Sequence, residues 1–343
     1  MAWPDAVAEE DVRSFLIALD WHGLVPYFHQ LAASRLPGEL RSLLRARALL
    51  HVAVEHERLV ELRKVSTALH SREVRTLTVK GSALAYQIYP AAYLRPRADH
   101  DLLIDSSRID SVRELFTSLG YTESSTGGSL ITAQTTFLRD DESIPHVFDI
   151  HWRTSNVHAV SNALDAETIF ASATAHPEVE HLLVPSLAHS LLVALLHRAA
   201  HHHDSDRLIW LADIDLLVRK IGAEGVVACL DDARKRQALS VCVRGLSLTS
   251  EWFDTPLPPL PEMTSDKLRW LAGRRAGRLE YFFNDFRALP TWRSRAQWIR
   301  ELAFPTEDFM RTHFSERGDK SLPRLYLKRG VRGLLRIFTH SGR

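Results

Sequence analysis

Asp99 and Asp101 stand two residues apart in a run, DHDLLI, whose composition is typical of a β-strand. Side chains alternate across a strand, so residues at i and i+2 point to the same face, only a few ångströms apart. Two carboxylates placed in this way repel each other unless a cation lies between them. Mg²⁺ accepts one or two protein carboxylates and leaves the rest of its octahedron to water and substrate phosphates. The pair therefore predicts a divalent-metal site.

A third carboxylate, Asp149, lies in a later β-prone run, HVFDIHW. If its strand lies beside that of Asp99 and Asp101, the three carboxylates converge and could hold two metal ions about 3.5 to 4 Å apart. Asp149 would then act as a base or as a ligand of the second ion. This is the chemistry of phosphoryl or nucleotidyl transfer. The alternative is that DHD is a solvated strand end and Asp149 a surface carboxylate.

A Gly-Ser turn precedes the acidic run, in KGSALAYQ. Gly81 at the end of a strand permits a sharp turn with exposed N–H groups, and Ser82 begins the next helix, so the two could hold a phosphate at a helix N-terminus. A polyanion also needs fixed positive charge, for which Lys80 and Arg95 are the best placed. The alternative for each cation is a solvated charge at a loop end.

The order of strand, Gly-Ser, helix, Asp-x-Asp and a third Asp on a later strand resembles the polymerase-beta-like nucleotidyltransferase superfamily. More narrowly, the chain from about Lys80 to Leu217 is similar to a bacterial family of uncharacterised nucleotidyltransferases through KGSALAYQIYP, LRPRADHDLLI, FDIHWR, LLHRAAHHH and RLIWLADIDLL. The spacing from Ser82 to Asp99 is longer than in the minimal superfamily motif. His100 stands between the acids, where an aliphatic residue is commoner, and we expect it to point to the opposite face of the strand.

The resemblance implies an α+β fold, with a mixed sheet flanked by helices, N-terminal helices and a C-terminal helical lobe that closes the nucleotide cleft. It implies Gly81 and Ser82 at the triphosphate, Asp99 and Asp101 on the metal, and Asp149 as the third acid. Mg²⁺ is the implied cofactor, with Mn²⁺ as its substitute.

The implied reaction moves a nucleoside monophosphate from an NTP to an acceptor hydroxyl, with release of pyrophosphate. ATP binding belongs to this expectation, although ATP, GTP, CTP and UTP all stay open as the donor. The acceptor is also open among a small molecule, a saccharide, a peptide and RNA, as is the oligomeric state. Two alternatives compete: a nucleotide-binding or regulatory protein without turnover, and a toxin-like enzyme that nucleotidylates RNA or protein.

Hydrophobic periodicity divides the chain into four regions. These are an N-terminal helical segment at 1–70, the nucleotidyltransferase core at 71–185, a helical lobe at 186–255, and a helical region with a basic tail at 262–343. The core carries β-prone runs at 76–79, 101–104, 135–138 and 147–152. The sequence PLPPLP between the last two regions cannot continue a helix. Gly222 is predicted to end a helix of the lobe.

Composition bounds the class of protein. With 343 residues, 45% of them hydrophobic and 25% charged, the chain is expected to fold into two or three globular domains. Lys and Arg number 43 against 42 Asp and Glu, so no bulk charge indicates nucleic-acid binding. Two cysteines exclude a disulfide framework or a multi-Cys zinc site. The absence of a signal pattern and of long apolar runs predicts a cytoplasmic protein without a transmembrane segment.

Three further features carry weaker predictions. The cluster His197, His201, His202 and His203 favours a structural or substrate-cleft role over a zinc site. Asp213 lies in an apolar helix and needs a partner, for which we expect Arg207 or a histidine of the preceding helix. The tail at 320–343 has seven Lys or Arg and no acid. We expect it to form an amphipathic helix that packs its apolar face on the protein, with anionic lipid, RNA or an acidic partner as alternatives.

Overall fold

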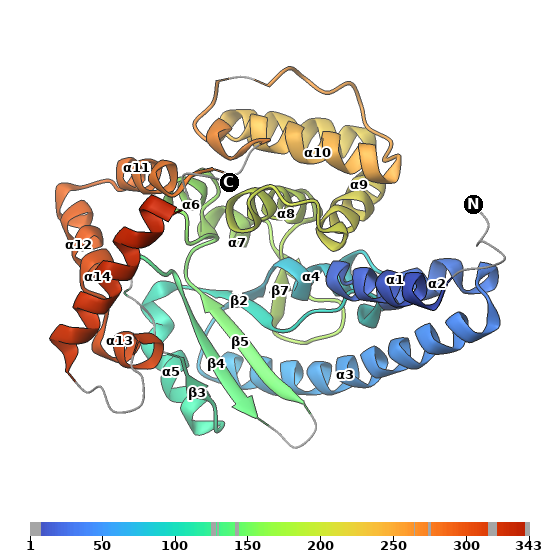
Figure 1. Cartoon of the computed structure of the whole chain (residues 1–343), viewed down its shortest axis with the longest axis horizontal. Coiled ribbons are helices and arrows are strands. Elements are labelled where there is room, and N and C mark those ends of the chain that lie inside the picture. The colour runs from blue at the N-terminus through green and yellow to red at the C-terminus, as the bar shows by residue number, and fades with distance from the viewer. Residues whose placement is uncertain are drawn as a thin grey trace.

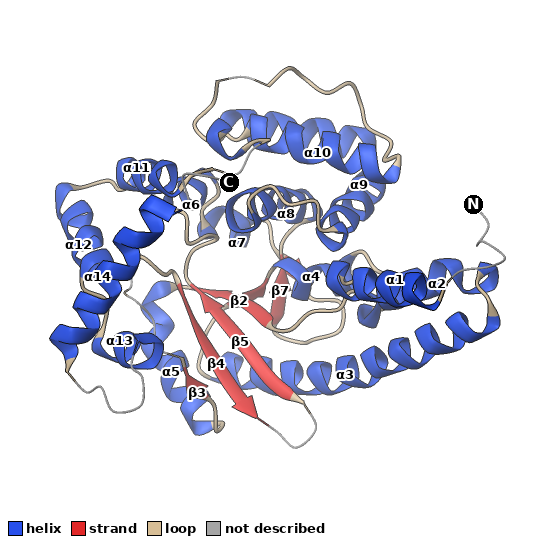
Figure 2. Ribbon diagram, viewed as in Figure 1, coloured by secondary structure: helices blue, strands red, loops and turns tan. Residues whose placement is uncertain are grey.

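The computed structural model describes residues 8–124, 128, 130–140, 144–263, 265–273, 276–314 and 321–339. Within these residues seven strands form one mixed sheet, in the order β3-β4-β5-β2-β1-β7-β6. Strands β2 and β5 are parallel, as are β1 and β7, and the other neighbours are antiparallel. The strands are β1 Thr76–Thr78, β2 His100–Ile104, β3 Thr122–Glu123, β4 Gln134–Asp140, β5 Pro145–His151, β6 Thr174–Ala175 and β7 Leu182–Val184. The helix-flanked mixed sheet (Figure 2) confirms the α+β class.

Helices precede, interrupt and follow the sheet (Figure 1). Before it come α1 Glu9–His22, α2 Val25–Ala32 and α3 Gly38–Ser71. Between the strands lie α4 Lys80–Gln87, α5 Ile109–Ser118, α6 His158–Ala163 and α7 Ala166–Ala171. After it come α8 Leu187–His202, α9 Leu208–Lys235, α10 Leu239–Phe253, α11 Arg278–Ala288, α12 Trp292–Ala303, α13 Glu307–Phe314 and α14 Leu322–Thr339.

The four β-prone runs of the sequence correspond to β1, β2, β4 and β5, with ends shifted by one or two residues. Strands β3 and β6 are two residues long, too short for hydrophobic periodicity to reveal them, and β7, with three residues like β1, was not predicted. The division of the chain into four regions stays a prediction.

The two faces of the sheet bury different helices. On β2, Leu102 and Ile104 pack with residues of α3 and α5. Leu103 points the other way and joins the core formed with α8, α9 and α10. His100 stacks on Phe148 of β5, with ring centroids 4.9 Å apart. This confirms that His100 faces the α3 side of the sheet, because Asp101 lines a cavity on the α8 side.

The N-terminal helices lie against the helical lobe. Leu16 and Leu19 of α1 and Leu40 and Leu44 of α3 form a cluster with Ile209 and Ala212 of α9. Helices α1 and α2 lie at one end of the molecule and α11 to α14 at the other (Figure 1). The first seventy residues therefore help to wall the space between the sheet and α9.

Helix α9 bends at the glycine that the sequence singles out. Gly222 has φ 70° and ψ 178°, a conformation that interrupts the helix and that side chains other than glycine seldom adopt. The predicted end of a helix at Gly222 is therefore a sharp bend after which the helix resumes. Residues 254–263 contain no helix or strand, as the PLPPLP run predicts.

Helix α14 packs through a different stripe from the one that we expected. Leu325 is fully buried, and the hydroxyl of Tyr326 donates to the backbone oxygen of Pro305 at 2.6 Å. The prediction is wrong for Leu327 and Val331, whose exposed fractions are 69% and 48%. The side chains of the other members of the predicted face, Leu334, Leu335 and Phe338, lie outside the described residues.

Both cysteines are buried as free thiols, Cys229 on α9 and Cys242 on α10. Burial raises the pKa of Cys229 to about 12 and that of Cys242 well above its ordinary value. Among the described helices, none combines the length and the apolar character that crossing a bilayer requires.

Candidate active site

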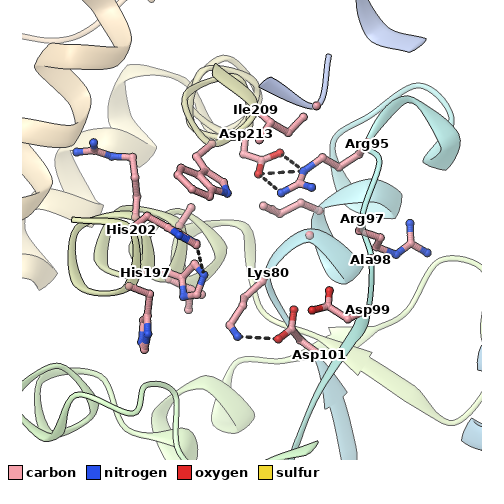
Figure 3. Close-up of a pocket in the computed structure, with 18 of the residues that line it drawn as sticks. Lys80, Arg95, Arg97, Ala98, Asp99, Asp101, His197, His202, Ile209 and Asp213 are labelled. Carbon is pink, nitrogen blue, oxygen red and sulfur yellow. Dashed lines mark hydrogen bonds and ion pairs between the residues drawn. The ribbon is translucent and has the colours of Figure 1, made fainter. Parts of the chain in front are cut away.

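A cavity of about 640 Å³ lies between the sheet and helices α8 and α9. Its lining includes Asp99, Asp101 and Asp149, together with Gly81 at the start of α4. Side chains from α1, α2 and α3 complete the wall. Figure 3 shows Asp99 and Asp101 on one side of this space, His197 and His202 of α8 on another, and Lys80 between them.

Strand register brings two of the predicted carboxylates together. Asp101 on β2 lies directly opposite Asp149 on the neighbouring parallel strand β5. His151 follows Asp149 by two residues and so shares its face. One ligand atom from each of Asp101, Asp149 and His151 lies within 4.8 Å of the others. We call these three residues the acidic cluster. The prediction that the strand of Asp149 lies beside that of Asp101 is confirmed.

Asp99 precedes β2 and lines the cavity, but it lies outside the acidic cluster. Burial and the nearby charges of Asp101 and Asp149 raise its pKa to about 6. The neighbouring Asp101 behaves in the opposite way. Its burial favours the neutral acid, but the charge of Lys80 and a hydrogen bond with His151 outweigh burial and hold its pKa well below the ordinary range. The two acids of the DHD run therefore differ in charge near pH 6.

Lys80 forms an ion pair with the acidic cluster. Its Nζ donates to Oδ1 of Asp101 at 2.6 Å and lies 3.3 Å from Nε2 of His151. Nε2 of His151 is itself 2.9 Å from the same Asp101 oxygen. Lys80 has φ 54°, in the left-handed region, at the point where β1 turns into α4. This turn directs the lysine from the start of a helix to the floor of the cavity.

Asp149 is fixed by two side chains of β4. Oγ1 of Thr136 donates to Oδ1 of Asp149 at 2.5 Å, and Nε2 of Gln134 donates to Oδ2 at 3.3 Å. Thr136 lies opposite Asp149 in the antiparallel register of β4 and β5. The carboxylate thus keeps one orientation toward the cavity.

Ser82 joins the start of α4 to the acidic strand. Its hydroxyl donates to the backbone oxygen of Asp99 and accepts from the backbone N–H of Asp101, both at 3.2 Å. The side chain is completely buried. The hydroxyl of Ser82 therefore positions the segment that carries the two acids. Its backbone N–H, in the first turn of α4, stays a predicted phosphate contact.

Gly81 makes room for Arg95. A Cβ at Gly81 would lie 3.1 to 3.2 Å from the guanidinium of Arg95, a tighter contact than side chains normally make. The guanidinium therefore packs against the turn between β1 and α4. The packing of Arg95 is enough to explain why position 81 is a glycine. The contact of Gly81 with phosphate stays a prediction.

Arg95 is committed to a buried ion pair with Asp213 of α9. Its Nε and Nη2 donate to the two carboxylate oxygens at 2.8 Å each, and the hydroxyl of Tyr89 adds a third bond at 2.8 Å. Nη1 donates to the backbone oxygen of Pro96 at 2.8 Å. The prediction that Arg207 or a histidine pairs with Asp213 is therefore wrong. The chain reverses direction between α4 and β2 and so brings Arg95 to Asp213. Hydrophobic periodicity describes one element at a time and gives no sign of this contact.

The histidines of α8 form a neutral wall of the cavity. Nε2 of His197 lies 3.1 Å from Nε2 of His202, and His201 contacts the hydroxyl of Ser155 at 2.9 Å. Burial, followed by the charge of Lys80, lowers the pKa of His201 to about 3 and that of His202 to about 4. His203 is exposed and lies apart from them, at the end of α8.

The ring of His202 stacks on that of Trp210, with ring centroids 3.6 Å apart. Within the described residues, the group with metal-binding geometry is the acidic cluster, and the α8 histidines do not form one. A cleft role for His197, His201 and His202 is therefore better supported than a zinc site.

Comparison with known protein families assigns the chain to one of them. The model of the family described as "Uncharacterised nucleotidyltransferase" matches residues 8–254. The chain belongs to this family. The protein is thus a nucleotidyltransferase, an enzyme that transfers a nucleotidyl group. The match includes the N-terminal helices and ends just after α10, so α11 to α14 of this nucleotidyltransferase lie beyond it.

Among solved structures, the nucleotidyltransferase is similar to the solution structure of the antibiotic-resistance factor ANT(2'')-Ia. The sequence identity is 15%, the TM-score is 0.39, and the alignment covers 53% of this chain and 94% of the other. No protein of curated function matches the sequence.

Sequence reasoning missed His151 and the polar residues of β4. His151 carried a usable signal, because the run FDIH places it two residues after Asp149 on a strand and hence on the same face. Thr136 and Gln134 had no such signal. Their contact with Asp149 depends on the register of β4 against β5, which the sequence does not specify.

Proposed function

We propose that this nucleotidyltransferase moves a nucleoside monophosphate from an NTP to an acceptor hydroxyl, with pyrophosphate leaving, and that it requires Mg²⁺ or Mn²⁺. One observation carries the proposal. Asp101 and Asp149 lie opposite each other on adjacent strands, on the floor of a cavity that also receives the first turn of α4. Carboxylates on the floor of the cavity can bind the metal of a metal–polyphosphate complex, and the N–H groups at the start of α4 can bind its phosphates.

The donor set of the acidic cluster fits such a cation. Asp101 and Asp149 supply the hard oxygen ligands that Mg²⁺ and Mn²⁺ prefer. His151 contacts Asp101 at 2.9 Å and would fix the orientation of that ligand. A cation bound there would neutralise phosphate charge and lower the pKa of the attacking hydroxyl.

The protein binds the phosphates and orients the reacting groups for the following reaction. The acceptor oxygen attacks the α-phosphorus, the bond from that phosphorus to the oxygen bridging the β-phosphate breaks, and pyrophosphate leaves with that oxygen. Lys80 and the first-turn N–H groups of α4 bind the phosphates. Asp149, held by Thr136 and Gln134, is a fixed ligand rather than a mobile base.

Asp99 is the better acceptor for the proton of the attacking hydroxyl. It lines the cavity but lies outside the acidic cluster, so its carboxylate is not committed to the proposed cation site. The sequence analysis left Asp149 open as a base or a ligand of a second ion and placed Asp99 on the metal, whereas here we propose Asp99 as the base.

The test is calorimetric binding of ATP, GTP, CTP and UTP analogues that cannot be hydrolysed, with and without Mg²⁺. We expect at least one nucleotide to bind with Mg²⁺, and Asp101→Asn to weaken that binding 100-fold or more. Asp110→Asn is the matched control, because Asp110 is an exposed carboxylate on α5. Equal binding by wild type and Asp101→Asn, or no binding of any nucleotide to the wild type, would refute the proposal.

A further inference from the structure

The acidic cluster already has a cation, the ammonium group of Lys80. We propose that Lys80 is an exchangeable substitute for the divalent cation: it neutralises Asp101 until a nucleotide arrives, then moves onto a phosphate and releases Asp101 to the metal. This inference rests on the proposed function, and it adds to it a coupling between nucleotide binding and metal binding.

The first argument is the position of Nζ. It lies 2.6 Å from Oδ1 of Asp101 and 3.3 Å from Nε2 of His151, so it contacts two of the three members of the acidic cluster. Asp101 is only 6% exposed. A carboxylate buried to this extent is costly unless a positive charge compensates it. Lys80 supplies that charge from within the chain.

The second argument is competition. A dication bound to Asp101 would meet the ammonium within a few ångströms, and like charges at such distances in a partly buried site repel strongly. Metal binding and the Lys80–Asp101 ion pair therefore oppose each other. The side chain of Lys80 must leave before the cation binds tightly.

The third argument is where the lysine can go. Lys80 is the first residue of α4, and the first turn of that helix is the predicted phosphate site. Of its other neighbours across the cavity, His197 and His202 are neutral rings, and Asp99 carries at most one negative charge (Figure 3). A triphosphate, with several negative charges, is the partner able to draw the ammonium away from Asp101.

The fourth argument is the backbone. Lys80 has φ 54°, a conformation that costs a residue other than glycine free energy and that persists in proteins mainly at functional sites. The glycine of the motif stands one position later. A long cationic side chain is thus held at a strained position that aims it at the acidic cluster.

The consequence is positive coupling: each ligand, metal or nucleotide, binds more tightly in the presence of the other, by the same factor. Part of this coupling is common to all metal–nucleotide complexes, because phosphates coordinate the metal directly. The part that Lys80 contributes is revealed by the affinity for metal alone.

The experiment is an electron paramagnetic resonance titration with Mn²⁺, with and without a nonhydrolysable NTP analogue. The proteins are wild type, Lys80→Met, Lys80→Arg and Asp101→Asn. Without nucleotide, we expect Lys80→Met to bind Mn²⁺ at least tenfold more tightly than wild type. Lys80→Arg, which keeps the positive charge, should remain as weak as wild type, and Asp101→Asn should bind least. With nucleotide, the gain in Mn²⁺ affinity should be smaller in Lys80→Met than in wild type.

The outcomes separate the two proposals. If Mn²⁺ and nucleotide bind together in wild type but Lys80→Met binds Mn²⁺ alone no better than wild type, the exchange role of Lys80 is wrong and the proposed function stands. If no protein binds Mn²⁺ even with nucleotide, both are wrong. Lys80→Gln replaces Lys80→Met if the latter does not give the wild-type circular dichroism spectrum.

Discussion

At the scale of single residues, the charge of Asp99 is unfavourable to the fold. Its pKa rises from 3.8 to about 6 because burial and two neighbouring carboxylates oppose ionisation. The folded protein therefore binds this proton more tightly than the unfolded chain does. Stability contributed by the protonated form is present below about pH 4 and is lost as the pH rises to about 6.

We accordingly expect Asp99→Asn to raise the free energy of unfolding of the metal-free protein at pH 7 by about 1 to 3 kcal/mol. The difference from wild type should shrink toward pH 4. Urea denaturation in EDTA at both pH values measures it, with Asp110→Asn as the control, which loses only an exposed pair with Arg113 and should change either value by less than about 1 kcal/mol. A difference independent of pH would contradict the assigned cause.

Thr136 tests whether the support of Asp149 matters. Its hydroxyl donates to Asp149 at 2.5 Å, and partners that orient metal ligands typically contribute 10- to 100-fold to metal affinity. We expect Thr136→Val to weaken Mn²⁺ binding in the presence of nucleotide by about that factor. Thr135→Val is the matched control, because Thr135 is the preceding residue of β4 and bonds Glu123 instead. Equal losses in the two variants would indicate a general effect on the strand.

At the scale of elements, the Arg95–Asp213 pair ties the segment between α4 and β2 to α9. Both side chains are buried, and Tyr89 adds a hydrogen bond to Asp213. The same guanidinium lies against Gly81. The bond network thus fixes the distance between the turn that begins α4 and the helical wall of the cavity.

Removing one partner leaves the other as an uncompensated buried charge. Asp213→Ala is expected to lower the free energy of unfolding by about 3 to 5 kcal/mol. Tyr89→Phe removes a single hydrogen bond to a charged group, and we expect a loss of about 1 to 3 kcal/mol. Guanidinium denaturation gives both values. A loss below about 1 kcal/mol for Asp213→Ala would show that the pair contributes little to the fold.

From the sequence one can predict the features that depend on local periodicity, namely where strands lie and which face a residue of a strand points to. Alternation along a strand was enough to place Asp101 and His100 on opposite faces and to find β1, β2, β4 and β5. It could not identify Arg95 as the partner of Asp213, because 118 residues separate them and helix packing alone brings them together. The contact of Lys80 with Asp101 likewise depends on the left-handed turn at Lys80, a conformation that the residue type disfavours.

At the scale of the whole molecule, the cavity and the C-terminal helices are separate. The described residues that line the cavity fall between Asp20 and Asp213, and α14 begins more than a hundred residues later. Helix α14 nevertheless carries exposed Leu327 and Val331 beside basic residues. If the acceptor is RNA, its reacting hydroxyl must enter the cavity, and the basic residues of α14 would contact its backbone farther away.

Deletion of residues 321–343 should therefore leave Mg²⁺-dependent nucleotide binding within about twofold of wild type, as measured by calorimetry. If the acceptor is RNA, the same deletion should reduce RNA binding and flatten its dependence on salt concentration. Loss of nucleotide binding on deletion would show that α14 supports the cavity. RNA binding unchanged by the deletion would remove the tail from the acceptor site.

The two buried thiols of α9 and α10 have a practical consequence. Reagents such as maleimides react with exposed thiolate, and Cys229 and Cys242 are neither exposed nor ionised near neutral pH. A single cysteine introduced on the surface would therefore accept a fluorophore or a spin label with the native thiols left in place. A pair of such labels, one on α2 and one on α8, would report in solution whether these two walls of the cavity approach each other when nucleotide binds.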